Sequence, residues 1–135
     1  MPHTLRVIPE HGLAVVCFDG VVDDAETIAA TGELALDPRW SPGNDVVWDG
    51  RRVLRAIGTL EPVGAGIAAA GGPLDMFLGA GRSAALLRPG ADPEMALLLG
   101  GLGWAHPGRI VKTFFDATEA ASWLGLPVEV LNQAT

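Results

Sequence analysis

Apolar residues gather in five short runs, and each run is bounded by turn-forming residues. Runs of this kind are typical of buried β-strands, and they cover residues 5–8, 13–18, 45–49, 83–87 and 109–115. The first two runs flank Pro9-Glu10-His11-Gly12, whose glycine can adopt the positive φ of a tight turn. The pattern therefore predicts an antiparallel hairpin followed by three further strands.

Apolar positions at helical spacing predict four helices in the remaining segments. These helices span residues 23–36, 59–70, 92–102 and 116–124. Asp23 and Asp116 are each followed three residues later by a glutamate, which is the spacing of a capping box. Gly125 and Pro127 then end the last helix.

The first helix carries a stripe of small and apolar residues. Its members are Ala25, Ile28, Ala29, Gly32, Ala35 and Leu36. Residues three and four apart share one face of a helix. Since small side chains permit a close approach, we expect this face to pack against the sheet.

The order of elements is β-β-α-β-α-β-α-β-α, which defines an α/β fold. Strands that alternate with helices form crossover units, so we expect a mixed, mostly parallel sheet with helices packed on it. A length of 135 residues is that of about one domain. We expect a single domain over residues 1–135, with its core in residues 5–125 and a short C-terminal tail at 126–135.

Composition indicates an apolar surface and limits the partners. Hydrophobic residues make up 49% and charged residues 19%, and the mean hydropathy is +0.32, so we expect a self-association face or an apolar ligand cleft. A net charge of −7 with a single lysine, Lys112, disfavours nucleic acids and anionic membrane surfaces. The charge is uneven: residues 19–49 hold eight acids and one base, whereas residues 50–90 hold five arginines and two acids.

The sequence has no segment typical of a signal peptide or a membrane span. Its N-terminus lacks a basic region and a long apolar core. The longest uncharged stretches, 62–74 and 95–108, are shorter than the roughly 18 residues that a span needs. Cys17 is the single cysteine and lies in an apolar run, so we expect a buried structural thiol. These features favour a cytoplasmic protein.

Several motifs resemble those of the STAS-like family, the superfamily of the sporulation anti-sigma-factor antagonist. They are Asp37-Pro38-Arg39-Trp40 after the first helix, the strand ending in Asp49, and the closing run Phe-Asp-Ala-Thr-Glu-Ala-Ala-Ser-Trp-Leu-Gly at 115–125. The resemblance covers residues 5–125 and is greatest to the uncharacterised bacterial branch of the family. It implies a STAS-like fold and a binding or signalling role without catalytic machinery.

The resemblance also suggests a modification site. In the antagonist proteins, a serine at the start of the helix after the central strand is phosphorylated. The comparable stretch here, 56–61, has Thr59 as its only hydroxyl, with Ile57 and Leu60 in place of the flanking aspartate and glycine. Thr59 is therefore the candidate phosphorylation site, and the alternative is a plain helix N-cap.

Asp49, Arg51, Arg52 and Arg55 form the strongest candidate ligand-binding site. In open parallel sheets, ligands bind beyond the carboxyl ends of the strands, where Asp49 is expected. Three guanidiniums beside it could hold a carboxylate or a phosphate through paired hydrogen bonds. The alternative is a solvated loop whose arginines pair with the acidic segment 19–49.

The remaining polar residues form no catalytic or metal-binding pattern. His3, His11 and His106 lack the spacing of metal ligands, and we expect them on the surface, at the terminus and in turns. No serine lies in a nucleophile elbow. The glycine-rich pieces match neither a dinucleotide fingerprint nor a P-loop. We therefore expect no catalytic residue, no metal and no cofactor.

The predicted helix 92–102 is more apolar than a helix with one side on a sheet needs to be. Residues 95–108 carry no charged side chain, although a surface helix normally has a polar stripe. Either a partner subunit or a lipophilic ligand could cover this face. We favour a partner, in a homodimer or another protein, and assign Leu98, Leu102 and Trp104 to the interface.

Taken together, these features favour a non-enzymatic STAS-like protein-interaction or regulatory module that associates with itself. The alternative is a small-ligand or lipid-binding carrier, with an apolar cleft and arginines that bind an acidic head group. An enzyme ranks third, because no acid–base or nucleophile set converges by spacing.

Overall fold

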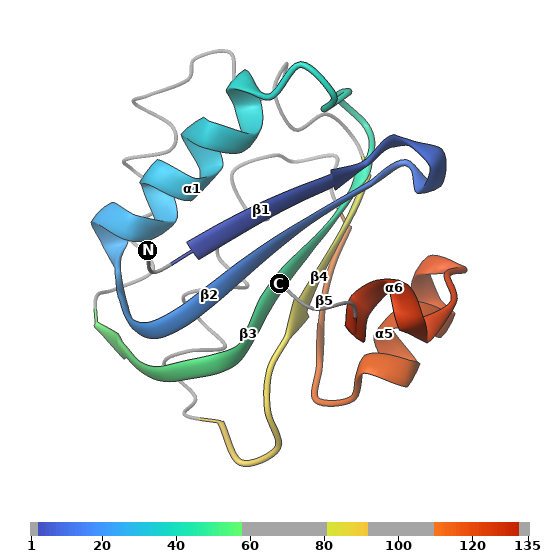
Figure 1. The fold of residues 1–135 in the computed structure, drawn as a ribbon. Helices are drawn as coiled ribbons and strands as arrows, with labels where there is room; N and C mark the ends of the chain where they lie inside the picture. The colour runs from blue at the N-terminus through green and yellow to red at the C-terminus, as the bar shows by residue number, and fades with distance from the viewer. Residues whose placement is uncertain (1–2, 58–80, 92–109, 133–135) are drawn as a thin grey trace.

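Five strands form one mixed sheet in the part of the chain that the structure, a computed structural model, describes: residues 3–57, 81–91 and 110–132 (Figure 1). In sequence order and in sheet order the strands are β1 (His3–Ile8), β2 (Leu13–Asp23), β3 (Asp45–Ile57), β4 (Arg82–Leu86) and β5 (Ile110–Phe114). β1 is antiparallel to β2, and every later pair is parallel. The α/β class and the mixed, mostly parallel sheet are thereby confirmed.

The turn between β1 and β2 is the predicted hairpin turn. A short 3-10 helix, Pro9–His11, is followed by Gly12, whose φ of 58° lies in the left-handed region that glycine adopts without strain. The Gly12 N–H donates to the Pro9 carbonyl at 3.0 Å. Ile8 is thereby placed opposite Leu13, which sets the register of the whole hairpin.

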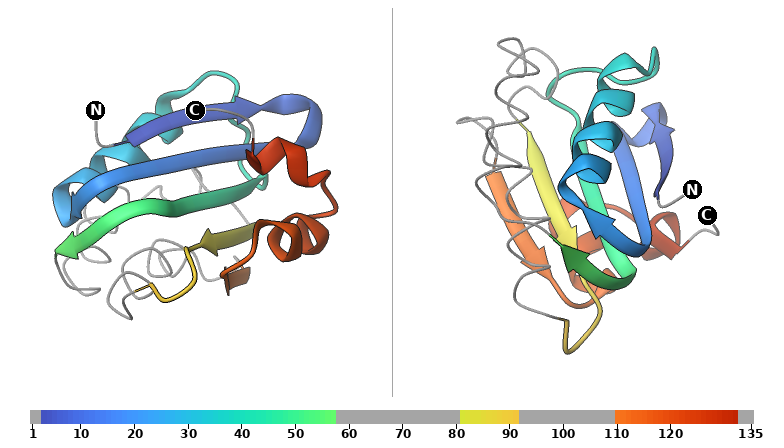
Figure 2. Two further views of the ribbon diagram at one scale, coloured as in Figure 1. Left: turned by 60° about the horizontal axis from the view of Figure 1, so that its bottom comes forward. Right: turned by 90° about the vertical axis from the view of Figure 1, so that its left-hand side faces the viewer.

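α1 (Asp24–Leu36) covers one face of the sheet (Figure 2). Its start was predicted correctly, since the Asp23 carboxylate accepts a hydrogen bond from the Glu26 backbone N–H at 2.8 Å. This cap satisfies one of the N–H groups that a helix leaves unpaired in its first turn.

The face that α1 turns to the sheet differs from the predicted one. Ala25, Ala29 and Gly32 are exposed, and Leu36 is 84% exposed. The buried residues are Thr27, Ala30, Thr31 and Leu34. These positions have helical spacing too, and the Thr31 hydroxyl donates to the Thr27 carbonyl at 2.9 Å, so it is buried with its hydrogen bond made.

Two helices cover the other face at one end of the sheet: α5 (Ala117–Leu124) and α6 (Val128–Asn132) (Figure 2). Asp116 caps α5 by accepting from the Thr118 N–H at 2.8 Å, and Gly125 ends it with a φ of 71°. The prediction of a tail outside the core at 126–135 is wrong, because Val130 and Leu131 of α6 are buried there.

β3 is longer than the sequence predicted. Gly50 does not end the strand, which continues through Arg51 and Arg52 to Ile57. β2 also continues, to Asp23, and the two strands remain paired along this length, with two register shifts. β2 supplies the backbone hydrogen bonds that allow β3 to continue beyond Gly50.

Alternate residues of the strands feed two apolar cores, one on each face of the sheet. Val16, Phe18 and Trp48 lie in the core under α1, whereas Val15 and Val47 lie in the core under α5 and α6. The predicted helices at 59–70 and 92–102 lie outside the described residues, as does the Ile28 side chain. None of the described helices has the length and apolar character needed to cross a membrane.

Candidate functional site

Asp49, which is buried, and Arg51, which is half-buried, form an ion pair in the middle of β3. Asp49 is 7% exposed and lies opposite Cys17 of β2. The Arg51 side chain donates to both carboxylate oxygens of Asp49, from Nε at 3.0 Å and from Nη2 at 2.8 Å. The Arg51 backbone N–H donates to the same carboxylate at 3.0 Å. This two-point contact fixes the guanidinium in one orientation.

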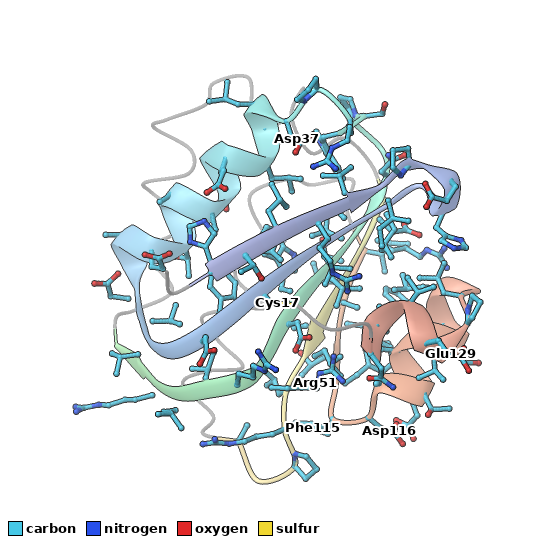
Figure 3. All side chains as sticks on the ribbon, viewed as in Figure 1. Cys17, Asp37, Arg51, Phe115, Asp116 and Glu129 are labelled. Carbon is cyan, nitrogen blue, oxygen red and sulfur yellow. The ribbon has the colours of Figure 1, made fainter. Side chains whose placement is uncertain are left out.

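The Arg51 guanidinium also reaches α6 (Figure 3). It donates to the Leu131 carbonyl at 2.6 Å and to Asn132 Oδ1 at 2.8 Å. Arg6 of β1 donates to the Val130 carbonyl at 3.1 Å. The last carbonyls of a helix accept no hydrogen bond from the helix itself and carry partial negative charge. Two arginines therefore supply hydrogen bonds to the carbonyls at the end of α6. The hydrogen bonds with Asp49 raise the pKa of Arg51 above its usual value.

A second pair of the same kind holds α5. Arg82 donates to both oxygens of Asp45, at 3.4 Å from Nε and 2.8 Å from Nη2. It also donates to the carbonyls of Trp123 at 2.6 Å and Leu124 at 3.3 Å. Asp45–Arg82 and Asp49–Arg51 are called here the aspartate–arginine clamps. Each joins a β3 carboxylate to the C-terminal end of a helix.

Cys17 is buried, as the sequence predicted, and its thiol contacts the first of these carboxylates. Its Sγ donates to Asp49 Oδ2 at 3.6 Å. Burial, together with the negative charge of Asp49, raises the pKa of Cys17 to about 11. The thiol therefore stays protonated at neutral pH, where only the thiolate is a strong nucleophile.

Arg52 and Arg55 lie farther along β3 and are exposed. Arg52 pairs across the sheet with Asp19, and Arg55 pairs with Val21. The prediction of a loop at these arginines is wrong, because they belong to a strand whose ladder extends to its end. Arg51 pairs with Asp49, a carboxylate of the acidic segment, and the binding of a ligand at these residues stays a prediction.

The environment of His3 differs most from the predicted one. The sequence predicted it on the surface, but it is 7% exposed and contacts two carboxylates of α1, Glu26 at Nδ1 and Glu33 at Nε2, the latter at 2.6 Å. Burial opposes its charge, but the hydrogen bonds with the glutamates outweigh this and raise the pKa of His3 above its usual value. These three residues are called here the His3 clasp. His11 is exposed in the turn, as predicted.

The sequence indicated Asp49 and Arg51 as a site, but it gave no local signal of the His3 clasp or of the Asp45–Arg82 clamp. Glu26 and Glu33 lie seven residues apart, on one side of a helix, and Asp45 and Asp49 lie four apart, on one face of a strand. Such spacing could have drawn attention to the acids. Their partners His3 and Arg82 lie on other strands, so only the folded chain brings them together.

The motifs on which the STAS resemblance rests have packing roles. Asp37 pairs with Arg39 at 2.9 Å directly after α1, and Trp40 is 8% exposed in the core. Trp123 contacts the Phe114 ring at 5.5 Å between centroids. Comparison of the chain with protein-family models, curated proteins and solved structures finds no match in any of the three.

Among the described residues, no group of three or more His, Cys, Asp and Glu side chains has the arrangement of a metal site. Thr59, Leu98, Leu102, Trp104 and His106 lie outside the described residues. The predicted phosphorylation site and the predicted apolar interface therefore remain predictions.

Proposed function

We propose that this protein is a non-enzymatic STAS-like binding module that works in the cytoplasm by associating with itself. The observation that carries the proposal is a part of the sheet, on the side of α5 and α6, that none of the described helices covers. There, Val21 is 55% exposed and Leu54 is 71% exposed, next to a register shift in the pairing of β2 and β3. Large apolar side chains exposed together are typical of a binding site.

The charged groups of the described residues support binding over catalysis. The carboxylates of Asp45 and Asp49 are held by arginines, which themselves satisfy helix ends. The buried thiol of Cys17 has a pKa of about 11, far above the value that a nucleophile needs. The arginines and carboxylates of the clamps position helices.

The STAS-like part of the proposal rests on the motifs together with the hairpin-led, mostly parallel sheet. In this reading Thr59 remains the candidate phosphorylation site. Leu98, Leu102 and Trp104 remain candidate interface residues.

A carrier of a small acidic or lipophilic ligand is the second candidate. It is favoured by the position of Arg52 and Arg55, which are exposed beside Val21 and Leu54. An apolar chain and an acidic head group would both find partners on such a surface.

Native mass spectrometry of the gently purified protein tests both candidates. The self-associating module predicts an assembly at a multiple of 14.0 kDa with no added mass. A carrier predicts a reproducible extra mass that disappears on denaturation. A bare 14.0 kDa monomer at high protein concentration would contradict both proposals.

A further inference from the structure

The imidazole ring of His3 contacts a carboxylate at each of its two nitrogens. Nδ1 contacts Glu26 and Nε2 contacts Glu33, the latter at 2.6 Å, and His3 as a whole is 7% exposed. An ionised carboxylate can only accept hydrogen bonds, and a neutral imidazole has a single N–H to donate. Both contacts are therefore hydrogen bonds only while the ring is doubly protonated and positively charged.

The two glutamates of α1 are the charged groups that act on His3 among the described residues. On β2, the residue opposite His3 is Phe18, whose ring centroid lies 6.4 Å from that of His3. Asp23, at the end of β2, is occupied in capping the helix. Burial disfavours the charged ring, yet the hydrogen bonds with both glutamates raise the pKa of His3 above its ordinary 6.5. As the pH rises through that higher value, the ring loses one proton and one of its two hydrogen bonds.

The two carboxylates differ in their access to water. The Glu26 side chain is 20% exposed, whereas that of Glu33 is 52% exposed. A carboxylate that loses its hydrogen-bond partner is destabilised most where water cannot replace that partner. When His3 loses one proton, the arrangement of lower free energy keeps the N–H at Nδ1 for Glu26 and leaves Glu33 to water. Deprotonation of His3 therefore breaks the contact with Glu33.

The half of α1 that carries Glu33 is also the weaker half of the helix. Gly32 lies directly before Glu33, and glycine is disfavoured in a helix interior because it loses more backbone freedom on folding than other residues. The last turn has no basic residue near its carbonyl end, whereas the first turn is capped by Asp23. Loss of the contact between His3 and Glu33 is therefore expected to loosen the end of α1 before its start.

We propose that the His3 clasp is a pH-dependent switch: loss of one proton from His3 frees Glu33, and residues 31–36 of α1 then detach from the sheet more often, while the first turn stays bound. Detachment uncovers Leu34, which is fully buried in the core under α1. The switch is closed in acid and opens as the pH rises, the direction set by a histidine that the fold stabilises in its charged form. It does not depend on self-association, because every contact in it lies within one chain.

Amide hydrogen exchange of the whole protein, followed residue by residue by NMR between about pH 6 and pH 9, tests the switch. Each rate is divided by the intrinsic rate of an unfolded amide at the same pH. The protection of amides 32–36 is expected to fall about fivefold or more over this range, the effect of losing one hydrogen bond between charged groups. Protection in α5 is expected to stay constant, because the arginine that holds α5, Arg82, keeps its charge.

Two histidine variants form a matched pair. His3→Gln is expected to remove the pH dependence of protection at amides 32–36. His11→Gln is the control, because His11 is exposed in the turn before Gly12, and this variant is expected to keep the dependence of the wild type. Glu33→Gln provides a second variant that leaves His3 in place. It is expected to show the low protection of the open switch at both ends of the pH range.

The outcomes bear on the switch and leave the proposed self-association to its own test. Equal falls of protection in α1 and α5 would show that pH acts on the whole fold, and would overturn the switch. Constant protection at amides 32–36 in the wild type, or a pH dependence that persists in His3→Gln, would overturn it too. A fall that begins in the first turn of α1 would overturn the release of Glu33.

Discussion

The two faces of the sheet hold their helices by different electrostatic means. On one face α1 is joined to β1 by the His3 clasp, in which a histidine lies between two glutamates. On the other face α5 and α6 are joined to β3 by the aspartate–arginine clamps, whose guanidiniums reach backbone carbonyls. Each device lies beside an apolar core, and each has a partly exposed member; the buried members are His3 in the clasp and Asp49 in one clamp.

The two faces differ in how the contacts that hold their helices respond to pH. Histidine changes its charge near neutral pH, whereas arginine stays charged at every pH at which the protein is folded. The clamps therefore hold α5 and α6 with constant strength across the neutral range. The clasp holds α1 with a strength that depends on the proton concentration. The same sheet thus has one face sensitive to pH and one that is not.

The largest expected effect comes from breaking a clamp. Asp49→Ala removes the carboxylate from Arg51, and we expect a loss of about 2–3 kcal/mol in the free energy of unfolding, less than for a fully buried pair because the guanidinium is partly exposed. Urea unfolding measures this loss. Asp37→Ala, which removes the carboxylate partner of the exposed Arg39, is the matched control and should cost less. Equal losses in the two variants would show that the clamp contributes no more than a surface pair.

The next largest effect is a loss of stability that depends on pH and concerns only the face covered by α1. His3→Gln keeps a polar side chain but loses the positive charge, and we expect a loss of about 1–2 kcal/mol at pH 6 from weakened hydrogen bonds to the glutamates. The pKa of folded His3 lies above its ordinary 6.5. The stabilisation is therefore complete below pH 6.5 and disappears as the pH rises through the higher folded pKa.

Urea unfolding of wild type and His3→Gln between pH 5 and 9 follows this difference. The difference in the free energy of unfolding between the two proteins should be largest in acid and should decrease toward alkaline pH. The difference in the free energy of unfolding between wild type and Asp49→Ala should stay constant over the same range, because the arginine of the clamp stays charged. A difference between wild type and His3→Gln that increases with pH would show that protonated His3 does not stabilise the fold.

The smallest effect concerns the exposed face of α1. Gly32 lies in the helix interior, and a Cβ atom built there meets nothing within 4 Å. Gly32→Ala should therefore raise the free energy of unfolding by about 0.5–1 kcal/mol, because alanine loses less backbone entropy in a helix. The control is Gly125→Ala, which should destabilise the protein because φ at Gly125 is 71°. A loss of stability in Gly32→Ala would indicate that this face of α1 is covered.

Features set by neighbours in the chain were predicted from the sequence. The turn at Gly12, the caps at Asp23 and Asp116, and the end of α5 at Gly125 all lie where short motifs placed them. Cys17 was expected to be buried because it lies within an apolar strand, and it is. Each of these depends on hydrogen bonds or strand alternation spanning a few residues, which the local sequence specifies.

The missed features depend on residues far apart in the chain. His3 is buried because Glu26 and Glu33 stabilise its charge, and α6 packs on the sheet because Arg51 reaches a carbonyl 80 residues away. α1 offered two faces with helical spacing, and packing on the sheet selected the one with Leu34. The sequence by itself determined the five strands, α1, α5 and their order, together with the ends that short motifs mark. Only the tertiary structure decided which faces and charges meet, because burying a charge is favourable only where a distant partner compensates for the lost water.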